Sequence, residues 1–270
     1  MESLKGLKDA DQIGSQNPRW IAIAIANPHA LTLTHIMPDH LSIHAAREDD
    51  MAEITGVLLS SFGHMPVEQA MGNVDTPEGR KAMRERHLQA WREHAKETDV
   101  PCGIKCVHTD PTSGKETIVG FSEWFIYANP LTPEHHERAN VLCSGTWVPE
   151  EGGQREKVQA ALKPTIDTRR KWLHGRKCAV LMYVCVDPAW RRQGAATMCV
   201  QWGVRKCNEL GIMAFLEATE EGQHVYKKCG FVEVEKVRCD WDGEVGVFPA
   251  MICWPRGTRE EDRKAAILSS

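Results

Sequence analysis

The chain has 270 residues, a length that suits one large domain or two small ones. Hydrophobic residues make up 42% of it and charged residues 26%, proportions that exclude a disordered or fibrous chain. Its formal net charge of −4 lacks the basic excess of proteins that bind nucleic acid broadly, and its longest apolar run, residues 20–26, is too short to cross a bilayer. We therefore expect neither a nucleic acid nor a membrane as a partner.

The ten cysteines do not have the spacing of a small disulfide-stabilised domain. This usage indicates reduced thiols and predicts a cytoplasmic protein, with a nuclear location also open. The apolar residues 20–26 follow a long polar stretch that contains Asp9 and Asp11, an order that fits neither a secretory signal nor a mitochondrial targeting segment. We divide the chain into an N-terminal extension (1–40), a folded domain (41–254) and a charged C-terminal tail (255–270).

The first part of the folded domain alternates between strand and helix patterns. Apolar alternation predicts a strand over 41–46, and the acidic residues at 48–50 suit the first turn of a helix, because they complement the helix dipole. One or two amphipathic helices are expected within 67–96. The elements expected next are strands over 103–108 and 116–127, an irregular excursion over 129–151, and a helix over 154–171 that Pro164 must kink or interrupt.

The second part of the domain has the pattern of crossover units. Residues 178–186 are almost continuously apolar, which predicts a strand buried on both faces, and a helix over 195–210 is closed by Gly211. The remaining expected elements are a strand over 212–216, a helix over 220–229, and strands over 231–237 and 247–254. Strand, helix and strand at this spacing predict a locally parallel strand pair within an α/β (α+β) fold.

The turn after the 178–186 strand is the best candidate for a ligand site. Its residues are Arg191, Arg192, Gln193, Gly194, Ala195, Ala196 and Thr197. A small-residue turn that opens a helix directs several backbone N–H groups at one point, where the helix dipole also favours an anion. Gly194 and Ala196 allow a close approach, and the two arginines add positive charge. The pattern predicts a phosphate cradle; the alternative is an arginine pair solvated at a helix start.

Together with this turn, three neighbouring segments resemble the GNAT superfamily of acyl-CoA N-acyltransferases. They are residues 184–188, 216–219 and 226–231. The resemblance is concentrated between Cys178 and Phe231, a weaker match reaches back to Leu41, and residues 217–222 are similar to fungal-type members. It implies the GNAT fold, a mixed and mostly antiparallel central sheet with a splayed parallel strand pair and flanking helices.

The resemblance also implies where the co-substrate, acetyl-CoA, binds. The main chain of Val184, Cys185 and Val186 would pair with the pantetheine arm as an added strand does. Residues 191–197 would hold the pyrophosphate without a metal. Many family members carry an asparagine at the start of the last helix, where this chain has residues 219–222 instead, so a contact from that segment is not implied.

Two kinds of catalytic residue follow from the same resemblance. Tyr226 would protonate the departing thiolate, and a carboxylate would accept a proton from the amine. Glu123 and Glu217 are both candidates for this base. Tyr226 could equally be an ordinary packing residue, and each glutamate could be structural.

The sequence thus predicts an N-acetyltransferase that moves an acyl group, expected to be acetyl, from acyl-CoA directly to a primary amine. A catalytically inactive acyl-CoA-binding or regulatory module is the alternative, because the phosphate cradle suits both. The acceptor is expected to be a small-molecule amine, with a protein amine also open. Cys102, Cys106 and His108 are spaced like part of a metal site, but no second ligand pair follows them, and His135 and His136 lack zinc-protease spacing, so no metal is expected.

Overall fold

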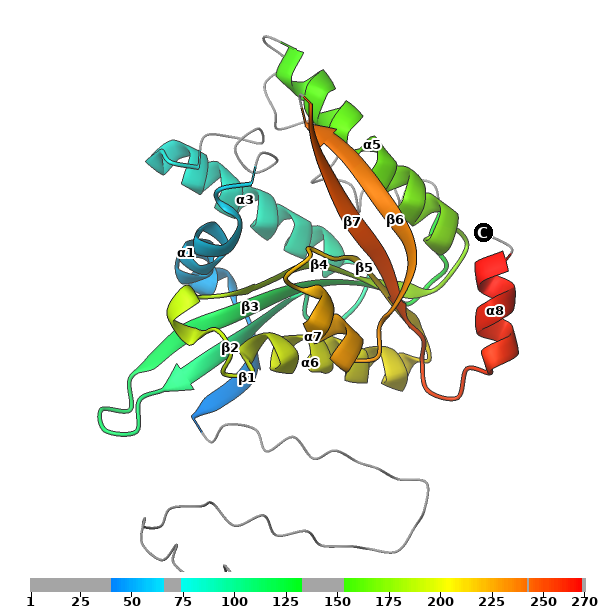
Figure 1. Ribbon diagram of the computed structural model, residues 1–270. Coiled ribbons are helices and arrows are strands. Elements are labelled where there is room, and N and C mark those ends of the chain that lie inside the picture. Colours follow the sequence, from blue (N-terminus) through cyan, green and yellow to red (C-terminus); the bar gives the residue numbers. More distant parts are fainter. Residues whose placement is uncertain (1–39, 66–73, 133–152, 242, 269–270) are drawn as a thin grey trace, which may run out of the picture. The chain divides into compact units, whose positions relative to one another are not determined.

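A seven-stranded sheet lies at the centre of the computed structural model, which describes residues 40–65, 74–132, 153–241 and 243–268, all within the unit Met37–Ser270 (Figure 1). Its strands, in spatial order, are β1 (Leu41–Ala45), β2 (Gly103–Thr109), β3 (Glu116–Tyr127), β4 (Cys178–Val186), β5 (Met213–Glu217), β7 (Glu244–Cys253) and β6 (Val232–Trp241). Neighbouring strands are antiparallel except β4 and β5, which are parallel. The predicted mixed sheet with one parallel pair is confirmed.

Helices cover both faces of this sheet (Figure 1). On one face lie α1 (Met51–Phe62), which follows the short 3-10 turn Glu48–Asp50, and α3 (Pro77–His94). On the other lie α6 (Ala195–Leu210) and α7 (Gln223–Lys228). The helix α5 (Gln154–Leu173) runs along β6, and α8 (Glu260–Leu268) follows β7 within the predicted charged tail.

The parallel pair β4–β5 separates after three residues. Cys178, Ala179 and Val180 pair with β5, whereas β4 continues beside β3 as far as Val186 and β5 continues beside β7. Residues 181–186 therefore present one strand edge that has no strand partner among the described residues. The predicted splay is confirmed. The prediction that the whole strand is buried on both faces is wrong beyond Leu181, because the neighbouring strand has diverged and residues 182–184 are only half-buried.

A bulge in β4 lies at the point of separation. Glu123 pairs with Tyr183 and the next residue of β3, Trp124, pairs with Leu181, so Met182 is an extra residue in β4. A bulge bends its strand and increases the local twist. This bend accompanies the divergence of β4 from β5.

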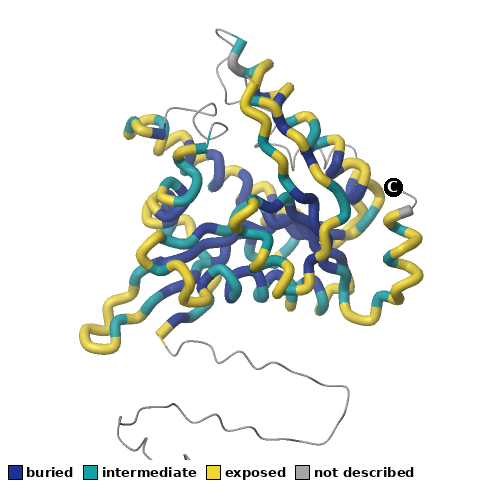
Figure 2. Tube along the Cα trace, viewed as in Figure 1, coloured by how far each residue is buried: buried dark blue, intermediate teal, exposed yellow. Residues whose placement is uncertain are grey.

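The core fills the space between the sheet and the helices, as the buried segments in Figure 2 show. Trp124, on the α6 side of β3, is fully buried. Gly203 of α6 lies directly on its indole ring, where any Cβ atom would overlap the ring. The missing side chain lets α6 pack close to the sheet, and this fixes the position of the turn that precedes the helix.

Most predicted elements are present within a few residues of their expected bounds. Pro164 does not interrupt α5, which is a single helix with the proline inside it, although proline removes a helical hydrogen bond; a kink at Pro164 stays a prediction. Packing of α5 along β6, where buried Trp172 donates to Glu235, holds the helix in place. The extension at 1–39 and most of the excursion over 129–151 lie outside the described residues. In the part of the chain that the structure describes, no helix is both long and apolar enough to cross a bilayer.

Two helical glycines give a matched test of this packing. Gly203→Ala should lower the free energy of unfolding by about 1–3 kcal/mol, because the new methyl group overlaps Trp124. Gly56→Ala, on the exposed side of α1, should raise it by about 0.5–1 kcal/mol, because the added methyl group would have no other atom within 4 Å. Chemical denaturation of both variants measures the difference. Equal effects would contradict the close packing of α6.

Candidate active site

The turn between β4 and α6 has the backbone shape of an anion cradle. Asp187 begins a 3-10 turn by accepting a hydrogen bond from the Ala189 N–H at 2.9 Å. Arg192 and Gly194 then take left-handed conformations, with φ of 65° and 94°, which turn the chain into α6. No side chain caps the helix, so its first N–H groups are available to a ligand. Glycine suits position 194 because other residues rarely adopt this φ.

Positive charge surrounds this cradle. Arg191 and Arg192 are both exposed, and neither forms an ion pair with another described residue. An exposed guanidinium without a protein partner can form bidentate hydrogen bonds with a phosphate. The turn predicted as a phosphate site therefore has the donors, the charge and the backbone geometry that a pyrophosphate requires.

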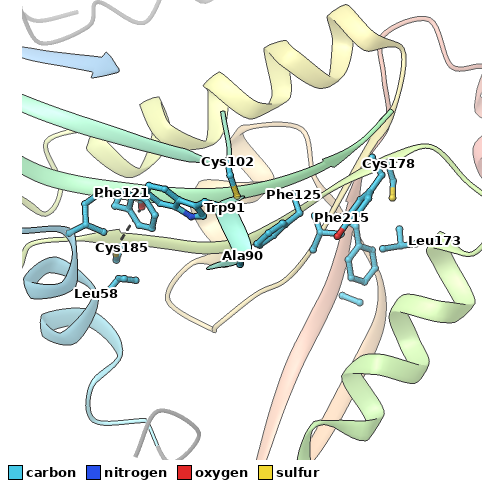
Figure 3. Packing of buried hydrophobic residues seen from close by; sticks show 14 of the residues in the cluster. Leu58, Ala90, Trp91, Cys102, Phe121, Phe125, Leu173, Cys178, Cys185 and Phe215 are labelled. Carbon is cyan, nitrogen blue, oxygen red and sulfur yellow. Dashed lines mark hydrogen bonds between the residues drawn. The ribbon is translucent and has the colours of Figure 1, made fainter. Parts of the chain in front are cut away.

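The open edge of β4 leads from the cradle toward the bulge. Val184, Cys185 and Val186 pair on one side with Ser122, Phe121 and Gly120 of β3. The Cys185 thiol is buried, 3.7 Å from the Phe121 carbonyl oxygen (Figure 3), and burial raises its pKa above the usual range. It is therefore not a nucleophile. What this segment offers is its unpaired main chain, which suits the extended, amide-containing pantetheine arm of acetyl-CoA.

Tyr226 lies on α7 and packs edge-to-face against Phe231, with ring centroids 6.0 Å apart. Gly222 leaves room for its ring, since a Cβ atom there would lie 2.8 Å from the Tyr226 ring carbon Cε2. Burial raises the pKa of the phenol above its ordinary value, and the thiols of Cys185 and Cys229 add to the rise. The phenol is thus protonated at neutral pH and is suited to donate a proton near β4.

Glu123 lies on the opposite face of the sheet, under α3, and is fully buried. Its Oε1 atom lies 2.9 Å from His87 Nδ1 and accepts a hydrogen bond from Trp91 Nε1 at 2.6 Å. Its Oε2 atom is buried and has no hydrogen-bond partner among the residues that the structure describes. A buried acceptor left in this state is costly, which makes it a point where a ligand can bind.

Glu217, the other predicted base, is held in an ion pair. Arg169 of α5 donates from Nε to Glu217 Oε1 at 2.8 Å and from Nη2 to Oε2 at 2.6 Å, and both side chains are nearly buried. The same guanidinium contacts the sulfur atom of Met182 at the bulge. Because both carboxylate oxygens are occupied, Glu217 is less suited than Glu123 to accept a proton.

Sequence reasoning did not find three residues that the structure brings to this region. The sequence pattern assigns His87 and Trp91 only to an amphipathic helix, although their spacing of four residues puts both on one helix face. Arg169 is 48 positions from its partner Glu217. These contacts join residues that are far apart in the sequence and meet only in the folded chain. The local sequence pattern therefore could not predict them.

The described residues do not form a recognisable metal site. No group of three or more His, Cys, Asp or Glu side chains is arranged there to hold a metal ion. Cys102 and Cys106 are buried, with burial raising the pKa of Cys106 to about 11. His135 and His136 lie outside the described residues.

Comparison with known families gives the class of the protein. The profile of the Acetyltransferase (GNAT) family matches residues 84–231, more than half of the chain. The match includes β3, β4, the cradle, α6 and α7, the elements that build the site described above. The chain therefore belongs to the GNAT acetyltransferase family. It is an acyltransferase whose general activity is N-acetyl transfer, and acetyl-CoA is the co-substrate of that family.

Solved structures share the fold at low sequence identity. Arylalkylamine N-acetyltransferase 2 from Aedes aegypti is 13% identical, with 79% of this chain and 98% of that chain covered at a TM-score of 0.54. A polyamine N-acetyltransferase from Drosophila melanogaster, which forms N-acetylagmatine, is 10% identical, with 79% of this chain and 99% of that chain covered at a TM-score of 0.53. An agmatine N-acetyltransferase mutant without ligand is 10% identical, with 80% of this chain and 100% of that chain covered at a TM-score of 0.54. No curated protein sequence matches significantly. The resemblance to fungal-type members stays a prediction.

His94 shows how strongly this side of the sheet excludes water. It lies at the end of α3 with its ring against Phe125 and Tyr127, and its Nε2 accepts a long hydrogen bond of 3.5 Å from the Ile126 N–H. Burial lowers the pKa of His94 to about 4, although the charge of Glu123 opposes the shift. The folded protein therefore holds this ring neutral, whereas the unfolded chain protonates it near pH 6.5.

This difference predicts a loss of stability in mild acid. Between pH 7 and pH 5 the unfolded state gains the proton first, so the free energy of unfolding should fall by about 2 kcal/mol through His94 alone. The full effect develops as the pH falls from 6.5 through 4. His94→Gln removes the titrating group, and denaturation at both pH values should show a flatter dependence for this variant. Identical slopes for the two proteins would contradict a neutral buried ring.

Proposed function

We propose that the protein transfers an acetyl group from acetyl-CoA directly to the primary amine of a small molecule. One observation carries the proposal: a buried carboxylate, one oxygen of which has no partner among the described residues, lies on β3 beside β4, and a protonated phenol lies near the open segment of β4 on the other face of the sheet. Glu123 is paired in register with Tyr183 of β4, and the Tyr226 phenol is within electrostatic range of Cys185. These are a proton acceptor and a proton donor on either side of one strand.

The strand edge and the cradle would hold the co-substrate. The main chain of Val184, Cys185 and Val186 pairs with the pantetheine arm, and residues 191–197 bind the pyrophosphate through backbone N–H groups and the two arginines. Bound in this way, the co-substrate supplies the acyl group as a thioester. Its thioester end then lies by the bulge, because the arm runs from the cradle along β4 toward Met182.

The two catalytic groups divide the proton transfers between them. Glu123 Oε2 takes one proton from the acceptor ammonium, which frees the nitrogen lone pair for attack on the thioester carbon. As the C–N bond forms and the C–S bond breaks, Tyr226 gives its proton to the departing sulfur. The acylated nitrogen then loses a second proton to the Tyr226 phenolate, which restores the phenol. Glu123 releases its proton to solvent. The net change is ammonium plus thioester to amide, thiol and one proton.

A small acceptor fits the surroundings of Glu123 better than a protein surface does. The carboxylate is fully buried and lies among aromatic rings, and Tyr183, its register partner, is in edge-to-face contact with both Phe62 and His87. The similar structures include enzymes named for arylalkylamines and agmatine, which are small amines. A protein amine is the alternative acceptor.

An amine panel tests the proposal. Thiol release from acetyl-CoA should be detected with at least one class among arylalkylamines, polyamines, amino sugars and peptide N-termini, and should require the amine. Calorimetry run in parallel reports binding of the co-substrate. Binding without thiol release across the panel would contradict the proposed function and favour an acyl-CoA-binding module. Release with peptides alone would overturn the small-molecule acceptor.

Tyr226→Phe isolates the proton donor. The variant keeps the ring that fills the space over Gly222, so affinity for acetyl-CoA should change little. Loss of the hydroxyl should lower kcat about 100-fold, the scale of general acid catalysis. Because the pKa of the phenol is raised, the wild-type rate should show no loss from its deprotonation up to pH ~10. An unchanged kcat in the variant would remove Tyr226 from the mechanism.

Arg191→Ala tests the cradle. Loss of a charge-assisted contact to phosphate should weaken acetyl-CoA binding about 10-fold or more, with a smaller change in kcat. Arg205, exposed on α6 and ten residues past its first position, is the matched control, and Arg205→Ala should leave the Kd unchanged. Calorimetric Kd values decide the test. Equal Kd values for both variants would contradict phosphate binding at this turn.

A further inference from the structure

The carboxylate of Glu123 is bound asymmetrically. Oε1 interacts with two ring nitrogens, His87 Nδ1 and Trp91 Nε1, while Oε2 has no partner in the described part of the chain although the whole side chain is buried. Indole is a donor only, so Oε1 is the acceptor of this hydrogen bond. The side chain is therefore held with one specific oxygen, Oε2, left for another partner.

A glycine on the neighbouring strand makes this arrangement possible. Gly103 of β2 is the register partner of Glu123, so the two residues lie side by side in the sheet. The Trp91 indole occupies the space above Gly103, where any Cβ atom would overlap the six-membered ring of the indole. From this position Nε1 reaches Oε1. The indole is also stacked on Phe121, with centroids 5.9 Å apart, and Figure 3 shows these two rings together.

The second partner is fixed by the same helix. His87 precedes Trp91 by one turn of α3 and is 2% exposed, and its ring meets the edge of Tyr183 at a centroid distance of 5.5 Å. Its position depends on α3, which begins at a Thr76 cap that accepts a hydrogen bond from the Gly79 N–H. Two ring nitrogens one turn apart thus converge on a single oxygen atom.

We propose that Glu123 Oε2 is the atom that accepts the proton of the acceptor amine, and that His87, Trp91 and Gly103 are positioning residues that hold it there. The inference rests on the proposed function, in which Glu123 is the base. The proton moves from R–NH3+ to Oε2, giving R–NH2 and a neutral carboxylic acid, so charge and atoms balance within the pair. His87 and Trp91 keep Oε1 occupied throughout, and the amine meets Oε2.

Trp91→Phe is the primary test, assayed with the most active amine of the panel. The variant keeps a ring over Gly103 but loses the N–H donor. We expect kcat to fall about 10-fold, because Oε2 is no longer held against the amine, while the KM for the amine and the Kd for acetyl-CoA change little. A purely structural role would weaken the binding of both substrates as well.

Trp172→Phe is the matched control. Trp172 is also buried, and its Nε1 donates to Glu235 of β6 at 2.9 Å, so this variant also loses an indole hydrogen bond to a glutamate. Its kcat should match that of the wild type. Gly103→Ala, which displaces the indole without touching Glu123, should reproduce the loss of kcat seen in Trp91→Phe.

A double variant completes the experiment. In a Glu123→Gln background, Trp91→Phe should have no further effect on kcat, because the residue acts through the carboxylate. Additive losses, or a kcat that falls no more in Trp91→Phe than in Trp172→Phe, would overturn the positioning role while leaving the proposed function in place. Absence of amine-dependent thiol release from the wild-type protein would overturn the proposed function, and this inference with it.

Discussion

The separation of β4 from β5 is the constraint on which the other features of the site depend. A parallel pair in the middle of a sheet normally satisfies the backbone hydrogen bonds of both strands, yet here pairing stops at Val180 and the bulge at Met182 turns β4 away. The cost is a row of N–H and C=O groups without a strand partner over residues 181–186. This edge ends at a turn whose backbone shape and positive charge suit a phosphate. An extended thioester ligand that is anionic at one end could therefore pair with the N–H and C=O groups of the edge and bind the turn at the same time.

The two faces of the sheet supply different chemistry to that edge. On the α7 side, burial keeps the Tyr226 phenol protonated. On the α3 side, two ring nitrogens contact one oxygen of Glu123, and the other oxygen has no partner among the residues described. A proton donor and a proton acceptor thus lie beside the same strand on opposite faces of the sheet. Glu123 is fully buried, and Tyr226 is half-buried with its ring against Phe231. Glu217, the other residue that the sequence predicted as a candidate base, forms an ion pair with Arg169 instead.

Features encoded by neighbouring residues could be predicted from the sequence. The apolar run of β4, the glycine at the start of α6 and the glycine after it define these elements locally, and the bounds of α6 agree with the prediction. The partners of Glu123 could not be predicted, because they depend on how α3 lies across β2 and β3, and on a glycine that matters only as the register partner of Glu123. The continuity of α5 through Pro164 is likewise decided by packing on β6 rather than by local propensity.

Amide hydrogen exchange of residues 181–186 tests the central claim most directly. In the free protein the N–H groups on the open edge of β4 should exchange faster than those of residues 178–180, which pair with strands on both sides. Saturating acetyl-CoA should slow exchange over 181–186 and at the first turn of α6, since the pantetheine arm and the pyrophosphate then accept or cover these groups. Exchange over 181–186 that is already slow without ligand, or that does not change when acetyl-CoA is bound, would contradict the account.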